Sequence, residues 1–364
     1  MAPAAETRSS GSGRGLSALI LAAGRSTRMK SDRPKVMHEI CGRPMLSYVL
    51  DACREAGVDR FSIVVGFGKE EVIDAFSGQR GVEFVEQNEQ RGTGHAVMMC
   101  GEAYEGFVGD CVVIAGDMPL VRADTLRTLI GGHRASGAAA SLATTVLDDP
   151  TSYGRIVRDE SGSFLRIVED RDCSEDELAI KEVNPSYYCF DAQALFASLG
   201  RIKTDNAKGE YYITDVLDIL RQGGKAVRAE TSVPAEDATG INSRADLAVV
   251  AAFMQRRIQA HWMDQGVSII DPRTTWIDAS VEIGAQTVIH PFTYLEGNAR
   301  IGGGCAIGPF AFVRSGAVVL DESRVGPGAL SAFDSTTEGR QRAQAGGKRS
   351  GQVVRRPPAQ SGIA

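Results

Sequence analysis

Short apolar runs alternate with amphipathic segments along the first part of the chain. The apolar runs lie at 16–23, 61–66, 82–87 and 111–117, and their continuous apolar character is typical of strands buried on both faces of a parallel sheet. Helical patterns lie between them at 44–56, 70–76 and 94–104. This alternation predicts a parallel sheet with helices on both faces.

The next part of the chain is richer in strand patterns. Strands are expected at 138–146, 154–157, 164–169 and 183–190, followed by helices at 210–222 and 243–264. The last helix is long and consists mostly of Ala, Val, Gln and Arg, so we expect it to connect two domains.

After Gly266 the period changes to six residues. Aliphatic residues recur without a gap at Ile277, Ile283, Ile289, Leu295, Ile301, Ile307, Val313, Val319 and Val325. Two positions before each of the last eight lies a mostly small residue: Val281, Thr287, Thr293, Ala299, Cys305, Ala311, Ala317 and Ser323. Such a repeat predicts a parallel β-helix, in which the aliphatic side chain fills the interior and the small residue turns the corner.

The repeat ends at Val325, and from Gly339 onward the chain carries six basic residues and no acidic one. We expect this end to be disordered, with a nucleic-acid or membrane arm as the alternative. The pattern therefore divides the chain into five parts. They are a disordered lead-in 1–15, an α/β domain 16–242, a connector helix 243–266, a short β-helix 267–330 and a basic tail 331–364.

Composition narrows the class of protein. With 364 residues and 43% hydrophobic residues the chain can bury a real core, and a net charge of −6 argues against a dedicated nucleic-acid binder. No apolar run approaches the roughly 20 residues that span a bilayer, and the first fifteen residues lack the apolar segment of a signal peptide. The seven cysteines form no C-x-x-C pair, so we expect a reduced, cytoplasmic protein without a membrane span.

Candidate chemistry begins directly after the first strand, in LAAGRSTRMKSDRPK (21–35). Gly24 permits close backbone approach, so successive N–H groups can form an anion nest, and five following cations add charge for several phosphate oxygens. The segment matches neither the P-loop nor the dinucleotide fingerprint. An anion-binding loop is favoured over a solvated charged turn.

Two further loops follow strands of the same sheet. In EQNEQRGTGHA (86–96) the amide of Gln87 and the backbone around Gly92 can read the polar edge of a base, with an ordinary strand-to-helix loop as the alternative. In IAGDMPL (114–120), Asp117 is placed to hold a hard cation such as Mg²⁺ or, alternatively, to cap the following helix.

Together these segments resemble one family. LAAG, TRM, PKVMH, QRGTGHA, GDMPL, YGRI, VED, GEYYITD and GINSR occur in this order and precede hexapeptide repeats. The chain resembles, over about residues 16–330, the bacterial N-acetylglucosamine-1-phosphate uridylyltransferase/glucosamine-1-phosphate acetyltransferase family. The resemblance implies an α/β, Rossmann-like nucleotidyltransferase domain with a mixed, mostly parallel sheet, followed by a short left-handed parallel β-helix of hexapeptide repeats.

The resemblance also implies site residues and partners. The nucleotide would be lined by Leu21, Ala22, Ala23 and Gly24, and its uracil read by Gln87, Gly92 and Thr93. Arg28 would contact the triphosphate and Lys35 the sugar phosphate, as the catalytic cations. Mg²⁺ would be held by Asp117 and Asn242, and the amino sugar by Gly154, Glu169 and Asn184. The substrates would be UTP and N-acetylglucosamine-1-phosphate, and the β-helix would form a homotrimer.

The implied reaction needs no protein nucleophile. A phosphate oxygen of the sugar phosphate attacks the α-phosphorus of UTP and pyrophosphate leaves, so catalysis consists of alignment and neutralisation of charge. Three positions depart from the family pattern: Ser26 stands where Gly is usual, Ala115 where Tyr is usual, and Asn184-Pro185-Ser186 where Asn-Thr-Gly or similar is usual. The last two border the sugar site, so a different sugar-1-phosphate is an alternative substrate.

The acetyltransferase part departs further. The match to the family fades past residues 313–329. The family's catalytic histidine is matched by none of His38, His95, His133, His261 and His290. Arg314 aligns with a substrate-binding arginine of the family, but the partners of that arginine are absent here. We therefore expect a Mg²⁺-dependent UDP-N-acetylglucosamine diphosphorylase without acetyltransferase activity. A non-catalytic, nucleotide-binding hexapeptide scaffold is the alternative of another class.

Overall fold

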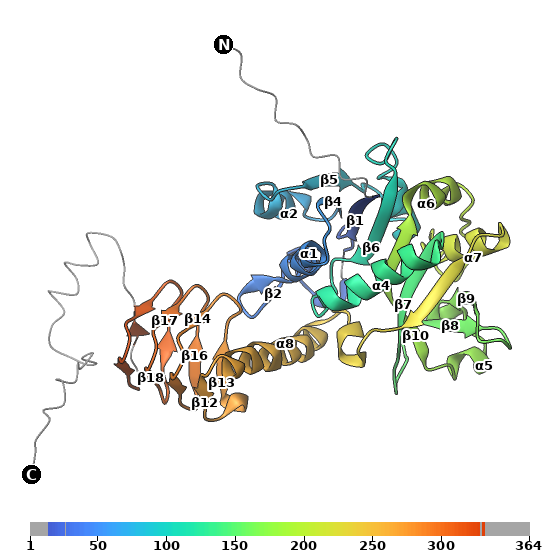
Figure 1. Cartoon of the computed structure of the whole chain (residues 1–364). Coiled ribbons are helices and arrows are strands. Elements are labelled where there is room, and N and C mark those ends of the chain that lie inside the picture. The colour runs from blue at the N-terminus through green and yellow to red at the C-terminus, as the bar shows by residue number, and fades with distance from the viewer. Residues whose placement is uncertain (1–13, 26, 328–329, 332–364) are drawn as a thin grey trace, which may run out of the picture. The chain divides into compact units, whose positions relative to one another are not determined.

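The structure is a computed structural model that describes residues 14–25, 27–327 and 330–331 (Figure 1). The predictions for most of the lead-in, for Ser26 and for nearly all of the basic tail fall outside the described residues. The described residues of 1–38 and 45–244 form one compact unit, and those of 39–44 and 245–364 form another. None of the described helices is long and apolar enough to cross a membrane.

The first unit is built on a mixed sheet in the strand order β11-β7-β10-β6-β1-β4-β5, with β8 paired to β10 and β9 paired to β8. The strands are β1 (Gly15–Leu21), β4 (Arg60–Val65), β5 (Val82–Glu86), β6 (Gly109–Ala115), β7 (Ala140–Val146), β8 (Gly154–Arg158), β9 (Phe164–Val168), β10 (Glu182–Asp191) and β11 (Val227–Thr231). Strands β6, β1, β4 and β5 run parallel, and β10 is antiparallel to β6 and β7. The direction of strand addition therefore reverses beside β1, where α/β sheets bind ligands.

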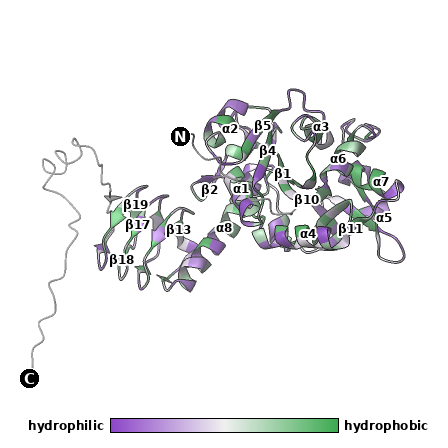
Figure 2. Cartoon of the chain, turned by 45° about the horizontal axis from the view of Figure 1, so that its top comes forward, coloured by the Kyte–Doolittle hydropathy of each residue, from purple (hydrophilic) through white to green (hydrophobic). Residues whose placement is uncertain are grey.

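Helices cover both faces of this sheet (Figure 1). Helices α1 (Met45–Glu55) and α4 (Ala123–Ser136) pack on each other, and α4 also packs on β7 and β10. Residues of α3 (Thr93–Met98), α6 (Ala192–Leu199) and α7 (Asp215–Gln222) join one hydrophobic cluster with β1, β6 and β10. The short helices α2 (Lys69–Phe76) and α5 (Glu175–Leu178) complete the unit. Helices such as α4 carry both hydrophobic and hydrophilic residues (Figure 2), as expected for a layer between core and solvent.

The second unit combines the long helix α8 (Arg244–Asp264) with a parallel β-helix. Its strands form three ladders: β12-β15-β18-β21, β13-β16-β19-β22 and β14-β17-β20. They are β12 (Ser268–Ile269), β13 (Thr275–Ile277), β14 (Glu282–Ile283), β15 (Val288–Ile289), β16 (Thr293–Leu295), β17 (Arg300–Ile301), β18 (Ala306–Ile307), β19 (Phe312–Val313), β20 (Val318–Val319), β21 (Arg324–Val325) and β22 (Leu330–Ser331). All nine aliphatic repeat positions are buried, so the fold class predicted from the sequence is confirmed.

The corners of the β-helix refine the role predicted for the small residues. A residue with positive φ recurs every six positions, at Gln286, Phe292, Asn298, Gly304, Phe310, Gly316 and Glu322. Each of the small residues from Thr287 to Ala317 directly follows such a residue and is buried. The left-handed backbone conformation turns the corner, and the small residue leaves room for the interior beside it.

Helix α8 caps the first coil of the β-helix through two buried glutamines. The amide of Gln255 donates to the carbonyl of Ile277 at 2.6 Å and accepts from the N–H of the same residue at 3.0 Å. Gln259 donates to the carbonyl of Thr275 at 2.7 Å. These bonds satisfy backbone groups that an open strand edge would leave unpaired. The turn of the hairpin β2 (Glu39–Ile40) and β3 (Arg43–Pro44) also belongs to this unit, because the carbonyl of Cys41 accepts from Ala279 at 2.9 Å.

Two predicted helices are shorter in the structure. Helix α7 begins at Asp215 rather than at residue 210, because the side chain of Asn206 binds both backbone groups of Glu210, at 2.6 and 3.2 Å. The backbone of Tyr211 bonds Arg91 and Gly94 instead of continuing a helix. Helix α3 ends at Met98, and turns follow where the pattern predicted helix as far as residue 104. Helices α4, α5 and α6 were not predicted.

Candidate active site

A cavity of about 300 Å³ lies where the parallel strands of the first unit end. It is lined from β1 and its loop by Leu21, Ala22, Ala23, Gly24 and Arg25, from the region of β5 and α3 by Gln87, Gln90, Gly92, Thr93 and Ala96, and elsewhere by Lys35, Val36, Ala115, Asp117 and Glu210. The seven residues predicted to bind the nucleotide therefore share one cavity, because the carboxyl ends of parallel strands meet at one edge of a sheet.

Gln87 is held in place by its neighbours. It is 4% exposed, its Nε2 donates to the carbonyl of Gly92 at 3.1 Å, and the same atom lies 3.0 Å from His95 Nδ1. Gln90, which the sequence interpretation missed, donates from Nε2 to the carbonyl of Ala23 at 2.7 Å. This bond joins the loop after β5 to the loop after β1, so the two sides of the cavity are fixed to each other.

Gly92 has a conformation that only glycine adopts easily. Its φ is +106°, and a Cβ added there would lie 2.5 Å from the carbonyl oxygen of Tyr211. Thr93, the next residue, begins α3, and its Oγ1 accepts from the N–H of Ile213 at 3.1 Å. The loop from 210 to 214 therefore packs directly against the turn that was predicted to read the base.

The two predicted phosphate-binding cations and the two predicted metal ligands form one cluster. Lys35 Nζ is ion-paired with the carboxylate of Asp117 and lies 3.4 Å from Asn242 Oδ1. Arg28 donates to the same Asn242 oxygen at 2.8 Å. Both side chains of the ion pair are mostly buried, with 15% and 18% exposure. The cluster lies beside the nucleotide-binding loops, because Lys35 and Asp117 line the same cavity.

These residues can hold a hard cation. A carboxylate and an amide oxygen are ligands that Mg²⁺ prefers, and Mg²⁺ usually takes its remaining ligands from water and substrate phosphates. Asp117 and Asn242 already direct their oxygens at one positive charge, the Lys35 ammonium. Within residues 14–25, 27–327 and 330–331, no group of three or more His, Cys, Asp and Glu side chains could hold a metal. Water and substrate oxygens would therefore complete a site at Asp117 and Asn242.

The predicted sugar residues are brought together by the antiparallel strands β8, β9 and β10. Gly154 of β8 is the register partner of Asn184 of β10, and a Cβ at Gly154 would lie 2.8 Å from Ile167 and 3.7 Å from the carboxylate of Glu169. Asn184 donates to the hydroxyl of Tyr188 at 2.6 Å. Glu169 and Tyr188 line a second cavity, of about 160 Å³.

The second cavity adjoins the first. Both are lined by Leu21, Thr93, Ala115 and Glu210, so a ligand that fills both would pass these four residues. Ala115 contributes only a methyl group at this junction. Burial raises the pKa of the Glu169 carboxyl, although the charge of Lys208 and a hydrogen bond from Thr214 oppose the shift. The second cavity therefore combines apolar walls with a carboxyl group that is poorly solvated.

Comparisons with known proteins show which families the two parts of the chain match. The family of the MobA-like NTP transferase domain matches residues 18–206, and the bacterial transferase hexapeptide family matches residues 280–315. The chain belongs to the MobA-like NTP transferase family. The proteins "Bifunctional protein GlmU" of Pelotomaculum thermopropionicum and of Shouchella clausii are 47% and 46% identical over 76% of this chain. The resemblance inferred from the motifs is confirmed.

The MobA-like transferase unit also shares its fold with a solved structure. A UDP-glucose pyrophosphorylase complexed with UDP-glucose matches with a TM-score of 0.54 and 20% identity, over 67% of this chain and 99% of that one. The present chain spans about 60% of the length of the two GlmU proteins. The comparisons thus show an NTP transferase domain followed by hexapeptide repeats, and about 40% of the length of those two relatives lies outside the match.

Several residues of the MobA-like transferase site were missed from the sequence. Glu210, Tyr212 and Thr214 line the second cavity together with Lys208. The motif GEYYITD contains the first three, and it contributed to the resemblance without assigning them a role. Arg155, in the motif YGRI, is 2% exposed and pairs with Asp170 at 3.1 Å. It ties β8 to the residue after Glu169, which fixes both sides of the predicted sugar site.

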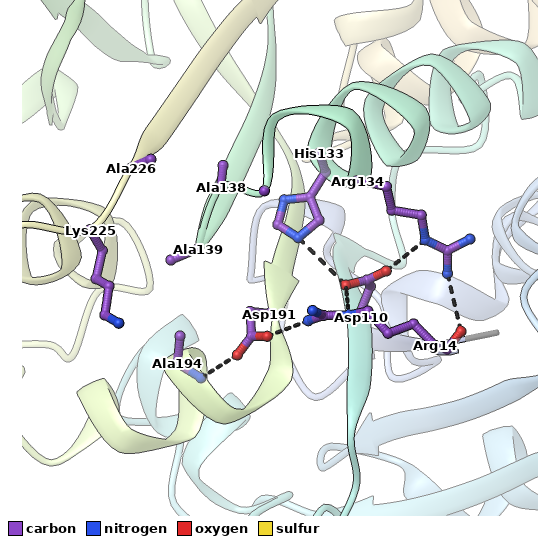
Figure 3. A pocket seen from close by; sticks show the side chains of 11 residues that line it. Arg14, Asp110, His133, Arg134, Ala138, Ala139, Asp191, Ala194, Lys225 and Ala226 are labelled. Atoms are coloured by element: carbon purple, nitrogen blue, oxygen red, sulfur yellow. Dashed lines mark hydrogen bonds and ion pairs between the residues drawn. The ribbon is translucent and has the colours of Figure 1, made fainter. Parts of the chain in front are cut away.

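A larger cavity, of about 560 Å³, lies at the opposite edge of the transferase sheet (Figure 3). Its centre is Asp110, which is 1% exposed and pairs with Arg14 at 2.9 Å and with Arg134 at 2.7 Å. His133 lies 3.6 Å from the same carboxylate, and burial lowers the pKa of this histidine. Both carboxylates of this cavity, Asp110 and Asp191, are paired with arginines. The cavity lies at the amino end of β6, away from the carboxyl ends of the parallel strands where the predicted residues gather.

Proposed function

We propose that the chain is a Mg²⁺-dependent uridylyltransferase that converts UTP and N-acetylglucosamine-1-phosphate to UDP-N-acetylglucosamine and pyrophosphate. The cluster of Arg28, Lys35, Asp117 and Asn242 beside a base-sized cavity is the observation that carries the proposal. A protein that only bound nucleotides would have no need for two cations and two metal ligands in contact. The similarity to the GlmU proteins and the shared fold with the pyrophosphorylase support the same reaction class.

The reaction joins two anions. A phosphate oxygen of the sugar phosphate forms a bond to the α-phosphorus of UTP, the bond from that phosphorus to the bridging oxygen breaks, and pyrophosphate leaves. The attacking oxygen is already ionised, so the protein needs no general base. Its task is to align the two phosphates and to neutralise their repulsion.

Each residue of the cluster has a role in that task. Asp117 and Asn242 would hold Mg²⁺, which supplies positive charge to the phosphate oxygens when bound. Lys35 then exchanges its contact with Asp117 for the phosphate of the sugar, and Arg28 binds the triphosphate. Gln87, Gly92 and Thr93 hold the base, and Leu21 to Gly24 pass close to the nucleotide. Gly154, Glu169 and Asn184 hold the sugar.

One observation favours a different sugar-1-phosphate as an alternative to N-acetylglucosamine-1-phosphate. Ala115 leaves the two cavities in contact at their junction, so a sugar with a larger substituent could occupy the second cavity. The reaction and the roles of the four cluster residues would be unchanged.

The proposal extends to the rest of the chain. We infer a cytoplasmic homotrimer that assembles through the β-helix and lacks acetyltransferase activity, since no histidine matches the catalytic one of the family. Sedimentation analysis of the full chain tests assembly, and release of free CoA thiol from acetyl-CoA with glucosamine-1-phosphate tests the second activity. A monomer, or acetyl transfer above the protein-free rate, would contradict these inferences.

The deciding experiment measures pyrophosphate release from UTP and Mg²⁺ with a panel of sugar-1-phosphates. Release should be strongest with N-acetylglucosamine-1-phosphate and should be abolished by EDTA and by Asp117→Ala. Stronger release with another sugar would keep the reaction and change the substrate. Binding of UTP without release from any sugar would instead favour the nucleotide-binding scaffold.

A further inference from the structure

A cavity of about 580 Å³ in the second unit has an acidic and aromatic lining. Glu39, Asp278 and Glu296 contribute three carboxyl groups to it, and Trp276 and Tyr294 contribute two aromatic rings. Among the described residues that line this cavity, none is a lysine or an arginine. Negative charge combined with aromatic rings attracts a cation.

Asp278 is a buried carboxylate in this cavity. It is 2% exposed, and it accepts hydrogen bonds from the N–H of Gly297 at 3.0 Å and from the hydroxyl of Tyr294 at 3.4 Å. Burial raises the pKa of this carboxyl, and the charge of Glu296 acts in the same direction, although the hydrogen bonds oppose the shift. In the part of the chain that the structure describes, no lysine, arginine or histidine pairs with Asp278. Buried carboxylates are usually paired with a positive charge, so a cation beside Asp278 would stabilise it.

Aromatic residues continue from this cavity along one ladder of the β-helix. Trp276, Tyr294 and Phe312 are successive register partners in β13, β16 and β19. The rings of Tyr294 and Phe312 meet edge to face, with 5.3 Å between their centres. Strand β22 is the next strand of the same ladder and ends at Ser331, where the basic tail follows. This aromatic column therefore leads from the cavity toward the start of the tail.

The tail has the complementary charge and is long enough to reach the cavity. From Gly339 onward it has no acidic residue and six basic ones: Arg340, Arg342, Lys348, Arg349, Arg355 and Arg356. Neighbouring strands of a ladder are about 4.8 Å apart, so β16 lies about 10 Å and β13 about 15 Å from β22. An extended segment from Ser331 to Arg340 can span about 30 Å. Arg340 and every basic residue after it can therefore reach the cavity.

We propose that the basic tail folds back along the aromatic column of its own chain and places arginine side chains in the acidic cavity. A guanidinium group can bind a carboxylate through two parallel hydrogen bonds and can stack its plane on an aromatic ring. The cavity offers both kinds of partner, whereas a lysine would supply charge without the stacking plane. Arg340 and Arg342 have the shortest connection to β22 among the six basic residues. This contact does not depend on the proposed transferase reaction.

The test is limited digestion of the full chain by trypsin, with mass spectrometry following cleavage at each basic residue of the tail. Trypsin cleaves after arginine and lysine, so an arginine held in the cavity is cleaved slowly. We expect Trp276→Ala, Asp278→Asn and high salt each to speed cleavage after Arg340 and Arg342 about fivefold. Trp276 is 37% exposed, so its replacement removes no core residue. The control is Glu282→Gln, because Glu282 is a surface residue of β14 that pairs with Arg300 outside the cavity.

A labelled peptide of residues 339–356 gives a second readout. It should bind at least about tenfold more tightly to a full chain whose six tail cations are replaced by glutamine than to the wild type, because the wild-type tail already occupies the cavity. This comparison leaves every residue of the cavity in place.

Two results would overturn the proposal directly. They are equal cleavage rates in the wild type, Trp276→Ala and Asp278→Asn, and equal peptide affinity of the wild type and the glutamine variant. Protection that increases with protein concentration would overturn it in favour of the tail of a second copy. Tight binding of the peptide to a wild type whose tail is cleaved rapidly would overturn it in favour of a separate basic partner.

Discussion

The ammonium group of Lys35 lies against the carboxylate of Asp117, a residue 82 positions away in the chain. The resemblance implied that Lys35 meets the sugar phosphate and that Asp117 meets Mg²⁺. In the free protein the two groups neutralise each other in a mostly buried position. The proposed function therefore requires Mg²⁺ binding to separate them, and this would couple metal binding to the release of Lys35 for the substrate.

Asp117→Asn should abolish most of the transferase activity. The amide keeps the shape of the side chain but removes the negative charge that would hold Mg²⁺. We expect pyrophosphate release to fall about 100-fold and the Mg²⁺ concentration for half-maximal rate to rise. Asp124→Asn is the control, because Asp124 lies on the exposed face of α4 and pairs with Arg127. An unchanged Mg²⁺ dependence in Asp117→Asn would remove Asp117 from the metal site.

Lys35→Met should have the opposite effect on the metal. Without the ammonium group the Asp117 carboxylate loses its protein partner, so Mg²⁺ should bind to the free protein at least as tightly as in the wild type. The sugar phosphate loses its cation, and kcat/KM for it should fall about 100-fold. Mg²⁺ binding by calorimetry and steady-state kinetics measure the two effects.

The surface variant Lys69→Met, which breaks a pair with Glu86, controls for the loss of one positive charge. If Lys35→Met weakens Mg²⁺ binding as strongly as Asp117→Asn does, Lys35 and Mg²⁺ do not compete for the Asp117 carboxylate. The proposed coupling between metal binding and release of Lys35 would then be wrong.

Gly92→Ala should destabilise the fold and weaken UTP binding. An alanine at φ +106° is strained, and its Cβ would meet the Tyr211 carbonyl oxygen at 2.5 Å. We expect a loss of about 2–3 kcal/mol in the free energy of unfolding, measured by urea denaturation. Gly106→Ala also places alanine at positive φ, +72°, but with no atom within 4 Å. Gly106→Ala should lower the free energy of unfolding by about 1 kcal/mol. Equal losses in the two variants would show that backbone strain, and not contact with the Tyr211 carbonyl oxygen, sets the cost at Gly92.

Asp215→Asn should change how stability depends on pH. Burial, with the neighbouring charges of Asp218 and Asp172, raises the pKa of Asp215 from 3.8 to about 6 in the folded protein. The folded state therefore binds more protons than the unfolded state between about pH 4 and pH 6, and ionisation of Asp215 lowers stability as the pH rises through this range.

The variant should match the wild type near pH 4 and exceed it above pH 6. The gain is on the order of 1 kcal/mol, after allowance for the solvent that reaches this half-buried carboxyl. Urea denaturation at pH 4.5, 6 and 8 measures it, and Asp74→Asn, on the exposed side of α2, controls for net charge. If the difference in free energy of unfolding between Asp215→Asn and the wild type grows toward low pH, the sign of the pKa shift is wrong.

Features that repeat locally could be predicted from the sequence. The β-helix follows from its six-residue period because every coil meets the same environment, and all nine aliphatic positions are buried as expected. The central strands of the sheet could also be predicted, because continuous apolar runs are typical of strands that are buried on both faces. The start of α7 was missed because Asn206, Arg91 and Gly94 bind the backbone of 210–211, and such bonds leave no mark on hydrophobic periodicity.

The sequence by itself determined the order of the motifs, the repeat and the kinds of side chain available for phosphate, metal and sugar. Only the tertiary structure decided which of them meet. Asn242 reaches Lys35 across 207 positions, and Tyr212 lies beside a cavity that residues of β1, α3, β6, β10 and the segment 208–214 line together. The physical reason is that periodicity reports contact with the core, whereas pairing between distant polar groups depends on how strands and loops are ordered in space.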